Sequence, residues 1–127
     1  KSTKNMSVID NTYNLNPNSF SAAIDLIKQL PKAKNILIMD DILELGEKGE
    51  QIHKKIGKKI GPHFDMLVYI GSMFGDEVAS AAKSSNQKIK LISPTDENYQ
   101  KIFSHSEKKK NIFVMGRSGQ KILKKYQ

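Results

Sequence analysis

Short apolar runs alternate with stretches of helical spacing along the whole chain, and this alternation restricts the fold more than any other feature. The runs that predict strands cover residues 7–10, 35–39, 66–70, 88–92 and 111–115. They are continuously apolar, which is typical of strands buried on both faces of a parallel sheet. The chain therefore predicts an α/β fold, a Rossmann-like three-layer sandwich with a mostly parallel sheet of five or six strands flanked by helices.

A helical pattern follows each predicted strand. The first helix stops at Pro31, because proline cannot continue a helix. In the second, Ile52, Ile56 and Ile60 recur every four residues, and lysines occupy the opposite side. His53 falls close to the apolar side of that helix, so we expect it to be packed and not catalytic. The other three helices are expected around residues 74–82, 99–103 and 122–126.

The length of 127 residues and a hydrophobic content of 38% suit one domain with one core. We expect a single domain over residues 1–127, in which residues 1–5 are the remnant of a linker. No apolar run approaches the roughly 18 residues of a membrane span, and no signal-peptide core is present, so a cytoplasmic protein is expected. The absence of cysteine excludes disulfides, thiolate catalysis and cysteine metal sites.

The net charge of +8, from 21 Lys and Arg against 13 Asp and Glu, favours polyanionic partners. A solvated lysine-rich surface explains the same charge without a ligand, and residues 108–110 read as an ordinary basic loop. No RNA-binding signature is present, so nucleic acid is an unlikely partner.

The turn between the first predicted strand and the first helix is rich in polar side chains. Asn16 precedes Pro17 at the first helical position, an arrangement typical of a helix N-cap. Asn11, Tyr13 and Asn14 add donors and acceptors at the carboxyl end of a parallel strand, where open α/β sheets bind ligands. A capped turn without a ligand is the alternative interpretation.

Two long segments, VIDNTYNLNPNSFSAAIDLI and ILIMDDILELGEKGEQIHKKIG, resemble the C-terminal domain of the Mur ligases, nearest the branch that adds D-alanyl-D-alanine in peptidoglycan synthesis. The first contains a D-[DS]-x-Y-N-A-N-P-like turn, and the second a V-L-G-D-M-x-E-L-G-like segment. A His-x-x-x-G pattern and a version of a late K-G-S motif follow in the family's order. The resemblance covers most of the chain.

This resemblance implies one domain of a larger ATP-dependent acid–amino-acid ligase, inactive when isolated. In that family ATP phosphorylates a substrate carboxylate, and an amine then attacks the acyl phosphate. The implied cofactors are ATP and Mg²⁺, held mainly by a central domain, and this chain indeed has no G-x-x-x-x-G-K-[ST] phosphate loop. The implied partners are the N-terminal and central domains, a UDP-linked muropeptide and an amino acid or dipeptide, with no membrane.

Matching the family motifs residue by residue implies two sets of site residues. The nucleotide-binding set is Asn11, Tyr13, Asn14 and Asn16. The substrate-binding set is Asp41, Glu44, Gly116 and Arg117. No catalytic residue or metal ligand is expected in this domain alone, and helix capping is an equally good role for Asp41. We expect these residues to converge at one edge of the sheet if the first, second and fifth predicted strands are near neighbours.

The chain departs from the family pattern in three motifs. Asn11 replaces an acidic residue, Asp40 replaces the Gly of G-D-M, and Met115 with Arg117 replaces the Lys and Ser of K-G-S. These departures are compatible with a divergent ligase that uses another amine substrate. Two further alternatives are a basic docking module without ligase activity and a folate-glutamylating ligase, whose D-G-A-H-N-P turn fits less well. Residues 116–119 form a candidate anion-binding turn.

Overall fold

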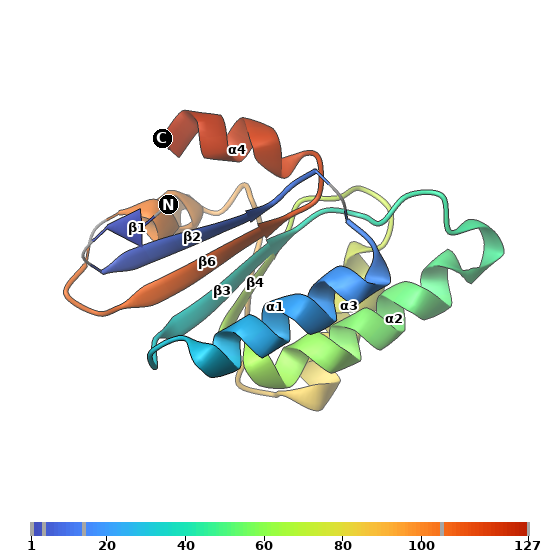
Figure 1. The fold of residues 1–127 in the computed structure, drawn as a ribbon. Coiled ribbons are helices and arrows are strands. Elements are labelled where there is room, and N and C mark those ends of the chain that lie inside the picture. The colour runs from blue at the N-terminus through green and yellow to red at the C-terminus, as the bar shows by residue number, and fades with distance from the viewer. Residues whose placement is uncertain (1, 4, 14, 105, 127) are drawn as a thin grey trace.

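The computed structural model describes residues 2–3, 5–13, 15–104 and 106–126 (Figure 1). Its strands are β1 (Ser2–Thr3), β2 (Met6–Asn11), β3 (Lys34–Met39), β4 (Met66–Tyr69), β5 (Lys90–Ile92) and β6 (Lys110–Met115). Its helices are α1 (Pro17–Gln29), α2 (Gly49–Ile60), α3 (Gly75–Ser85) and α4 (Gly119–Tyr126), with 3₁₀ helices η1 (Gly46–Lys48), η2 (Gly61–His63) and η3 (Glu97–Phe103). No helix in the described ranges is long and apolar enough to cross a membrane.

The strands form one sheet in the order β1-β2-β6-β3-β4-β5. The pairs from β2 to β5 are all parallel, and only β1 pairs antiparallel, with β2. The predicted α/β fold with a mostly parallel sheet is therefore confirmed. In addition to the five predicted strands, the sheet contains β1, which lies in the segment that we expected to be a linker remnant. Because β6 enters between β2 and β3, the three strand ends that carry the expected site are direct neighbours.

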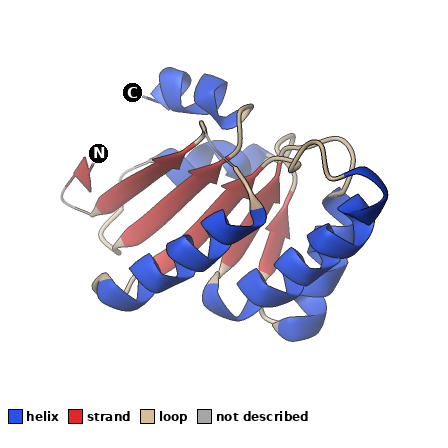
Figure 2. Cartoon of the chain, turned by 45° about the vertical axis from the view of Figure 1, so that its right-hand side comes forward, coloured by secondary structure: helices blue, strands red, loops and turns tan. Residues whose placement is uncertain are grey.

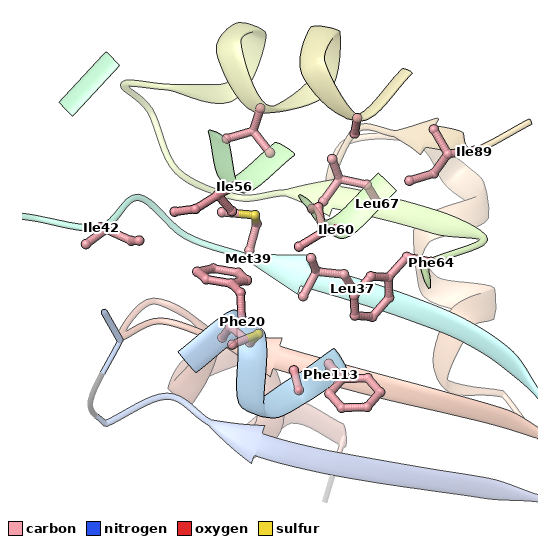
Figure 3. Packing of buried hydrophobic residues seen from close by; sticks show 14 residues of the cluster. Phe20, Leu37, Met39, Ile42, Ile56, Ile60, Phe64, Leu67, Ile89 and Phe113 are labelled. Atoms are coloured by element: carbon pink, nitrogen blue, oxygen red, sulfur yellow. The ribbon is translucent and has the colours of Figure 1, made fainter. Parts of the chain in front are cut away.

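The two faces of the sheet are covered unequally (Figures 1 and 2). Helices α1, α2 and α3 pack on one face, where Phe20, Ile60, Phe64 and Phe113 belong to the larger buried cluster (Figure 3). On the other face, η3 and α4 contribute Tyr99, Ile102, Phe103 and Leu123 to a second cluster. The molecule is thus a three-layer sandwich with one thick and one thin helical layer.

Three local predictions need adjustment. The fourth helix is the 3₁₀ helix η3, in which Tyr99 and Ile102, three residues apart, both reach the core; a 3₁₀ helix places residues of that spacing on one side. Strand β5 begins late because the Asn86 side chain accepts from the backbone N–H of Lys88, at 3.1 Å, and so holds a turn. Lys110, expected in a basic loop, is instead the first residue of β6 and is buried.

Candidate functional site

In the described part of the β2–α1 turn, several polar groups bond one another. The Asp10 carboxylate accepts from the backbone N–H and the hydroxyl of Thr12, at 3.0 and 2.7 Å. Asn16 caps α1, since its side-chain oxygen accepts from the N–H of Asn18 at 2.9 Å. The hydroxyl of Ser19 accepts from the N–H of Asn16 at 3.1 Å and completes a capping box. The geometry of Asn16 therefore matches the capping interpretation, and a nucleotide contact by this residue stays a prediction.

Tyr13 and Asn11 occupy different surroundings in the same turn. The Tyr13 side chain is 83% exposed, beyond the end of β2. Asn11 is half-buried and lines a hollow of about 180 Å³ between β2 and α1. Asn14 lies outside the described residues. Tyr13 is thus an exposed aromatic group of this turn.

The β6–α4 turn begins at Gly116, where the chain takes a φ of +106°. Its N–H donates to the carbonyl of Asn11 at 3.0 Å, while the N–H of Asp40 donates to the carbonyl of Met115 at 2.9 Å. A Cβ atom at Gly116 would lie 2.5 Å from the Cβ of Asp40. Glycine is therefore required here by both conformation and space. These contacts bring the ends of β2, β6 and β3 together.

Asp40 stabilises this turn from the end of β3. One carboxylate oxygen accepts from the N–H of Asp41 at 2.8 Å, and the other accepts from the N–H of Ser118 at 3.1 Å. The expected anion-binding turn at residues 116–119 is therefore already bound by a carboxylate of the same chain. In the sequence, Asp40 stands out only as a departure from the family pattern. Its role depends on β6 lying beside β3, which no local sequence pattern reveals.

Asp41 points to the β4–α3 loop and not to the β6–α4 turn. Its carboxylate accepts from the backbone N–H groups of Ser72, Met73 and Phe74, each at 3.0 Å, and from the hydroxyl of Tyr69. The side chain is buried, and the three N–H donors belong to residues that directly precede α3, whereas the Tyr69 hydroxyl comes from the last residue of β4. Asp41 thus holds, from a neighbouring strand, the loop that leads into α3, and its substrate contact stays a prediction.

Tyr69 is a further residue that the sequence did not single out. Burial, followed by the hydrogen bond to Asp41, raises the pKa of its hydroxyl well above the ordinary value. The tyrosine therefore stays protonated and keeps donating to Asp41. The pair joins the ends of β3 and β4.

His53 is packed, as the helical spacing predicted. Its ring is fully buried and stacks on Phe74, with the ring centroids 4.0 Å apart. The N–H of Ile42 donates to Nε2 at 3.0 Å, so Nδ1 carries the proton and donates to the carbonyl of Gly49 at 2.7 Å. Both ring nitrogens therefore hold the segment between β3 and α2.

That segment also carries Glu44, which is exposed and has a φ of +64°. Its neighbour Leu43 is 64% exposed, and Met73, on the adjacent β4–α3 loop, is 63% exposed. Together with Tyr13, these apolar side chains follow β2, β3 and β4 and so project at the carboxyl edge of the sheet. Such exposed apolar groups at one edge are typical of a surface that another domain covers.

The structure therefore brings together only part of the expected site. Asn11, Gly116 and the exposed Arg117 meet beside Asp40 at the ends of three neighbouring strands. The Asp41 carboxylate accepts from the β4–α3 loop instead, and Glu44 lies farther along the β3–α2 connection. Within the described residues, no three His, Asp or Glu side chains form a group that would hold a metal ion.

A comparison with protein families matches residues 1–118 to the Mur ligase, glutamate ligase domain. The chain belongs to this family. Its relatives include the UDP-N-acetylmuramoyl-tripeptide–D-alanyl-D-alanine ligase of Bacillus subtilis (strain 168), 32% identical over 97 residues that cover 76% of this chain and 21% of that protein. The Haemophilus influenzae ligase of the same name is 31% identical over 116 residues, 91% of this chain and 25% of that protein. The chain thus spans about a quarter of these relatives.

Solved structures agree with this assignment. A MurF structure from Acinetobacter baumannii superposes with a TM-score of 0.74 at 23% identity, covering 94% of this chain and 27% of that one. A MurF ligase from Thermotoga maritima in complex with ADP gives a TM-score of 0.70 at 20% identity, covering 99% of this chain and 29% of that one. The predicted family and fold are therefore confirmed: the chain is a Mur ligase C-terminal domain of the kind found in MurF ligases. These matches support neither the docking-module nor the folate alternative.

Proposed function

We propose that this chain is the C-terminal domain of a larger ATP-dependent ligase that joins D-alanyl-D-alanine, or a related amine, to a UDP-linked muropeptide. The observation that carries the proposal is the meeting of the β2, β6 and β3 ends, where Asn11, Gly116 and Arg117 share one edge. Ligands of open α/β sheets bind at such a switch in strand order. The names of the relatives and their greater length support the rest of the proposal.

ATP would supply the phosphoryl group that activates the substrate carboxylate. In this domain we assign the nucleotide-facing role to the β2–α1 turn, in which the exposed Tyr13 ring and Asn11 are the side chains best placed for contact. The carboxylates of Asp10, Asp40 and Asp41 already accept from backbone N–H groups. Mg²⁺ is therefore assigned to the other domains of the ligase.

Arg117 is the proposed anion-binding side chain. Its guanidinium stands on an exposed turn that Asp40 and Gly116 hold in place, and its fixed fork of donors suits a carboxylate or phosphoryl group. We assign it to the carboxylate of the incoming amine substrate or to the transferring phosphoryl group. Glu44, exposed on the segment after β3, is the proposed acidic contact for the amine.

Tyr13, Leu43 and Met73 would contact the missing domains when the ligase closes. Closure of this kind removes water from the reacting groups and completes the site. The isolated chain lacks the phosphate-holding half of that site. We therefore expect it neither to hydrolyse ATP nor to form an amide bond, and turnover by the purified chain would contradict this.

The ligase that carries this domain provides the test. ADP release that depends on both the muropeptide and D-alanyl-D-alanine would be measured with wild-type protein and with Arg117→Ala. Loss of a hydrogen bond to a charged group is worth about 1.5–3 kcal/mol, so kcat/KM should fall about 10- to 100-fold. Lys55→Ala, an exposed substitution on α2, is the matched loss of one positive charge and should change little. Equal activities of the two variants would remove Arg117 from the site.

A further inference from the structure

A groove of about 320 Å³ lies at the amino-terminal edge of the sheet, between the first residues of the strands and η3. It is far along the strands from the carboxyl edge discussed above. The groove is lined by six lysines: Lys34, Lys90, Lys101, Lys108, Lys109 and Lys110. Ile36, Met66, Ile92 and Ile102 add apolar lining. It therefore combines positive charge with a hydrophobic floor.

Strand register explains why the charges gather there. Lys34 on β3 stands directly opposite Lys110 on β6, while Met66 on β4 pairs with both Ile36 and Lys90. Residues two apart in a strand share a face, so these lysines lie on the face of the sheet that η3 covers. Like charges directly opposite each other in a sheet repel. The folded chain thus concentrates positive charge around an apolar patch.

The nearby Asp65 carboxylate, directly before Met66, accepts from the backbone N–H of Asn35 and is not part of the groove lining. The described residues that line the groove include no Asp or Glu, and the ion pair found in the described part of the chain joins Lys54 to Glu50, on α2. The Lys110 ammonium donates to backbone carbonyls of Ser104 and Lys101, at 2.5 and 3.5 Å, which carry no net charge. Burial and the charge of Lys34 lower the pKa of Lys110. An anion in the groove would relieve this repulsion.

Another lysine-rich hollow, between α2 and α3, is different. It is lined by Lys54, Lys55 and Lys58, but also by Glu77, and Lys54 pairs with Glu50 at 3.0 Å. Its charge is thus partly offset within the chain. This hollow is an internal control for effects that come from net charge alone.

We propose that the groove at the amino edge binds a small organophosphate, with its phosphate between Lys34 and Lys90 and its apolar part against Ile36 and Met66. Ammonium groups are good point-charge partners for phosphate, and the volume suits a small ligand. The concave shape and the absence of aromatic side chains among the described lining residues favour a small molecule over single-stranded nucleic acid, which stacks on aromatic rings. The proposal is independent of the ligase function, because the site lies at the opposite edge.

The test is a titration of the ¹⁵N-labelled chain with 2-naphthyl phosphate at constant ionic strength. Saturable amide shifts are expected at Lys34, Ile36, Met66 and Lys90, with inorganic phosphate binding more weakly because it lacks an apolar part. The exposed double variant Lys34→Gln/Lys90→Gln should bind about tenfold more weakly. The control Lys55→Gln/Lys58→Gln, which loses the same charge, should stay within about twofold.

Four results would overturn the proposal. They are the absence of saturable shifts, an equal loss of affinity in both double variants, naphthyl phosphate binding no tighter than inorganic phosphate, and a single-stranded oligonucleotide giving the same shifts at lower concentration. The substituted lysines are exposed, so a dispersed spectrum is expected for both variants and serves as the folding control.

Discussion

The two edges of the same parallel sheet differ in the charged groups that gather there: three carboxylates at the carboxyl edge, and a group of lysines at the amino edge, where Asp65 accepts from the N–H of Asn35. At the carboxyl edge, the carboxylates of Asp40 and Asp41 accept from backbone N–H groups of neighbouring loops, and that of Asp10 accepts from the N–H of Thr12 in its own turn. At the amino edge, Lys34 and Lys110 stand opposite each other without a carboxylate among the described groove residues. Acidic residues at a strand end therefore do not by themselves mark a ligand site. Here they build the loops that present Tyr13, Arg117 and their neighbours.

The largest expected effect is at Asp41. Substitution by alanine leaves three part-buried N–H groups and the Tyr69 hydroxyl without their acceptor, so the free energy of unfolding should fall by about 3–5 kcal/mol. Urea unfolding measures the change. Asp76→Ala, at an exposed position in the first turn of α3, is the control and should cost less than about 1 kcal/mol. Equal costs would mean that the carboxyl-edge carboxylates do not hold the loops.

A smaller effect should reveal the contact between Asp40 and Gly116. Gly116→Ala should cost about 2–3 kcal/mol, because of the positive φ and the 2.5 Å approach to the Cβ of Asp40. In the double variant Gly116→Ala/Asp40→Gly, the close contact between the two Cβ atoms disappears, whereas the strain of the positive φ at residue 116 remains. A double-mutant cycle should therefore give a coupling of at least about 1 kcal/mol. Strict additivity would show that the turn is not held from β3.

The two edges should also differ in the sign of their pH dependence. The folded-state pKa of Tyr69 is raised above its ordinary 10.0, so the stability it contributes is present below pH 10 and is lost as the pH rises further. The folded-state pKa of Lys110 is lowered below 10.5. The charged Lys110 side chain therefore destabilises the fold at neutral pH, and this destabilisation decreases as the pH rises towards 10.5. Urea unfolding between pH 7 and 11 measures the free energy of unfolding. Tyr69→Phe should remove its decrease above pH 10, and Lys110→Met should remove its increase towards pH 10.5. Unchanged pH slopes in both variants would contradict these assignments.

The smallest effect concerns the lysine pair at the amino edge. Lys34→Gln removes a charge that faces Lys110 and should raise the free energy of unfolding by a few tenths of a kcal/mol, about the size of a cross-strand charge effect. The increase should diminish in high salt, because the repulsion is partly screened. Lys55→Gln, on α2, is the control, and thermal denaturation of the two variants compares their stabilities. A stability loss in Lys34→Gln would mean that the amino edge carries no repulsion.

The sequence predicted the features that depend on local patterns. Continuous apolar runs predicted the parallel strands, Asn16 before Pro17 predicted the α1 cap, and the position of His53 on its helix predicted packing. The roles of Asp40 and Tyr69 were missed, because each depends on which strands become neighbours. The lysine groove was missed for the same reason, since Lys34, Lys90 and Lys110 come together only through the register of the sheet.

The measurement that tests the account most directly is an amide-shift titration of the chain with ADP and Mg²⁺, in wild-type protein and in Lys34→Gln/Lys90→Gln. Binding by one domain should be weak. Shifts at residues 11–18, 41–46 and 116–118 are expected in both proteins, as follows from the proposal that the nucleotide faces the carboxyl edge. Shifts confined to the lysine groove and absent from the double variant, or confined to the lysine face of α2, would contradict the assignment of the carboxyl edge to the ligase site.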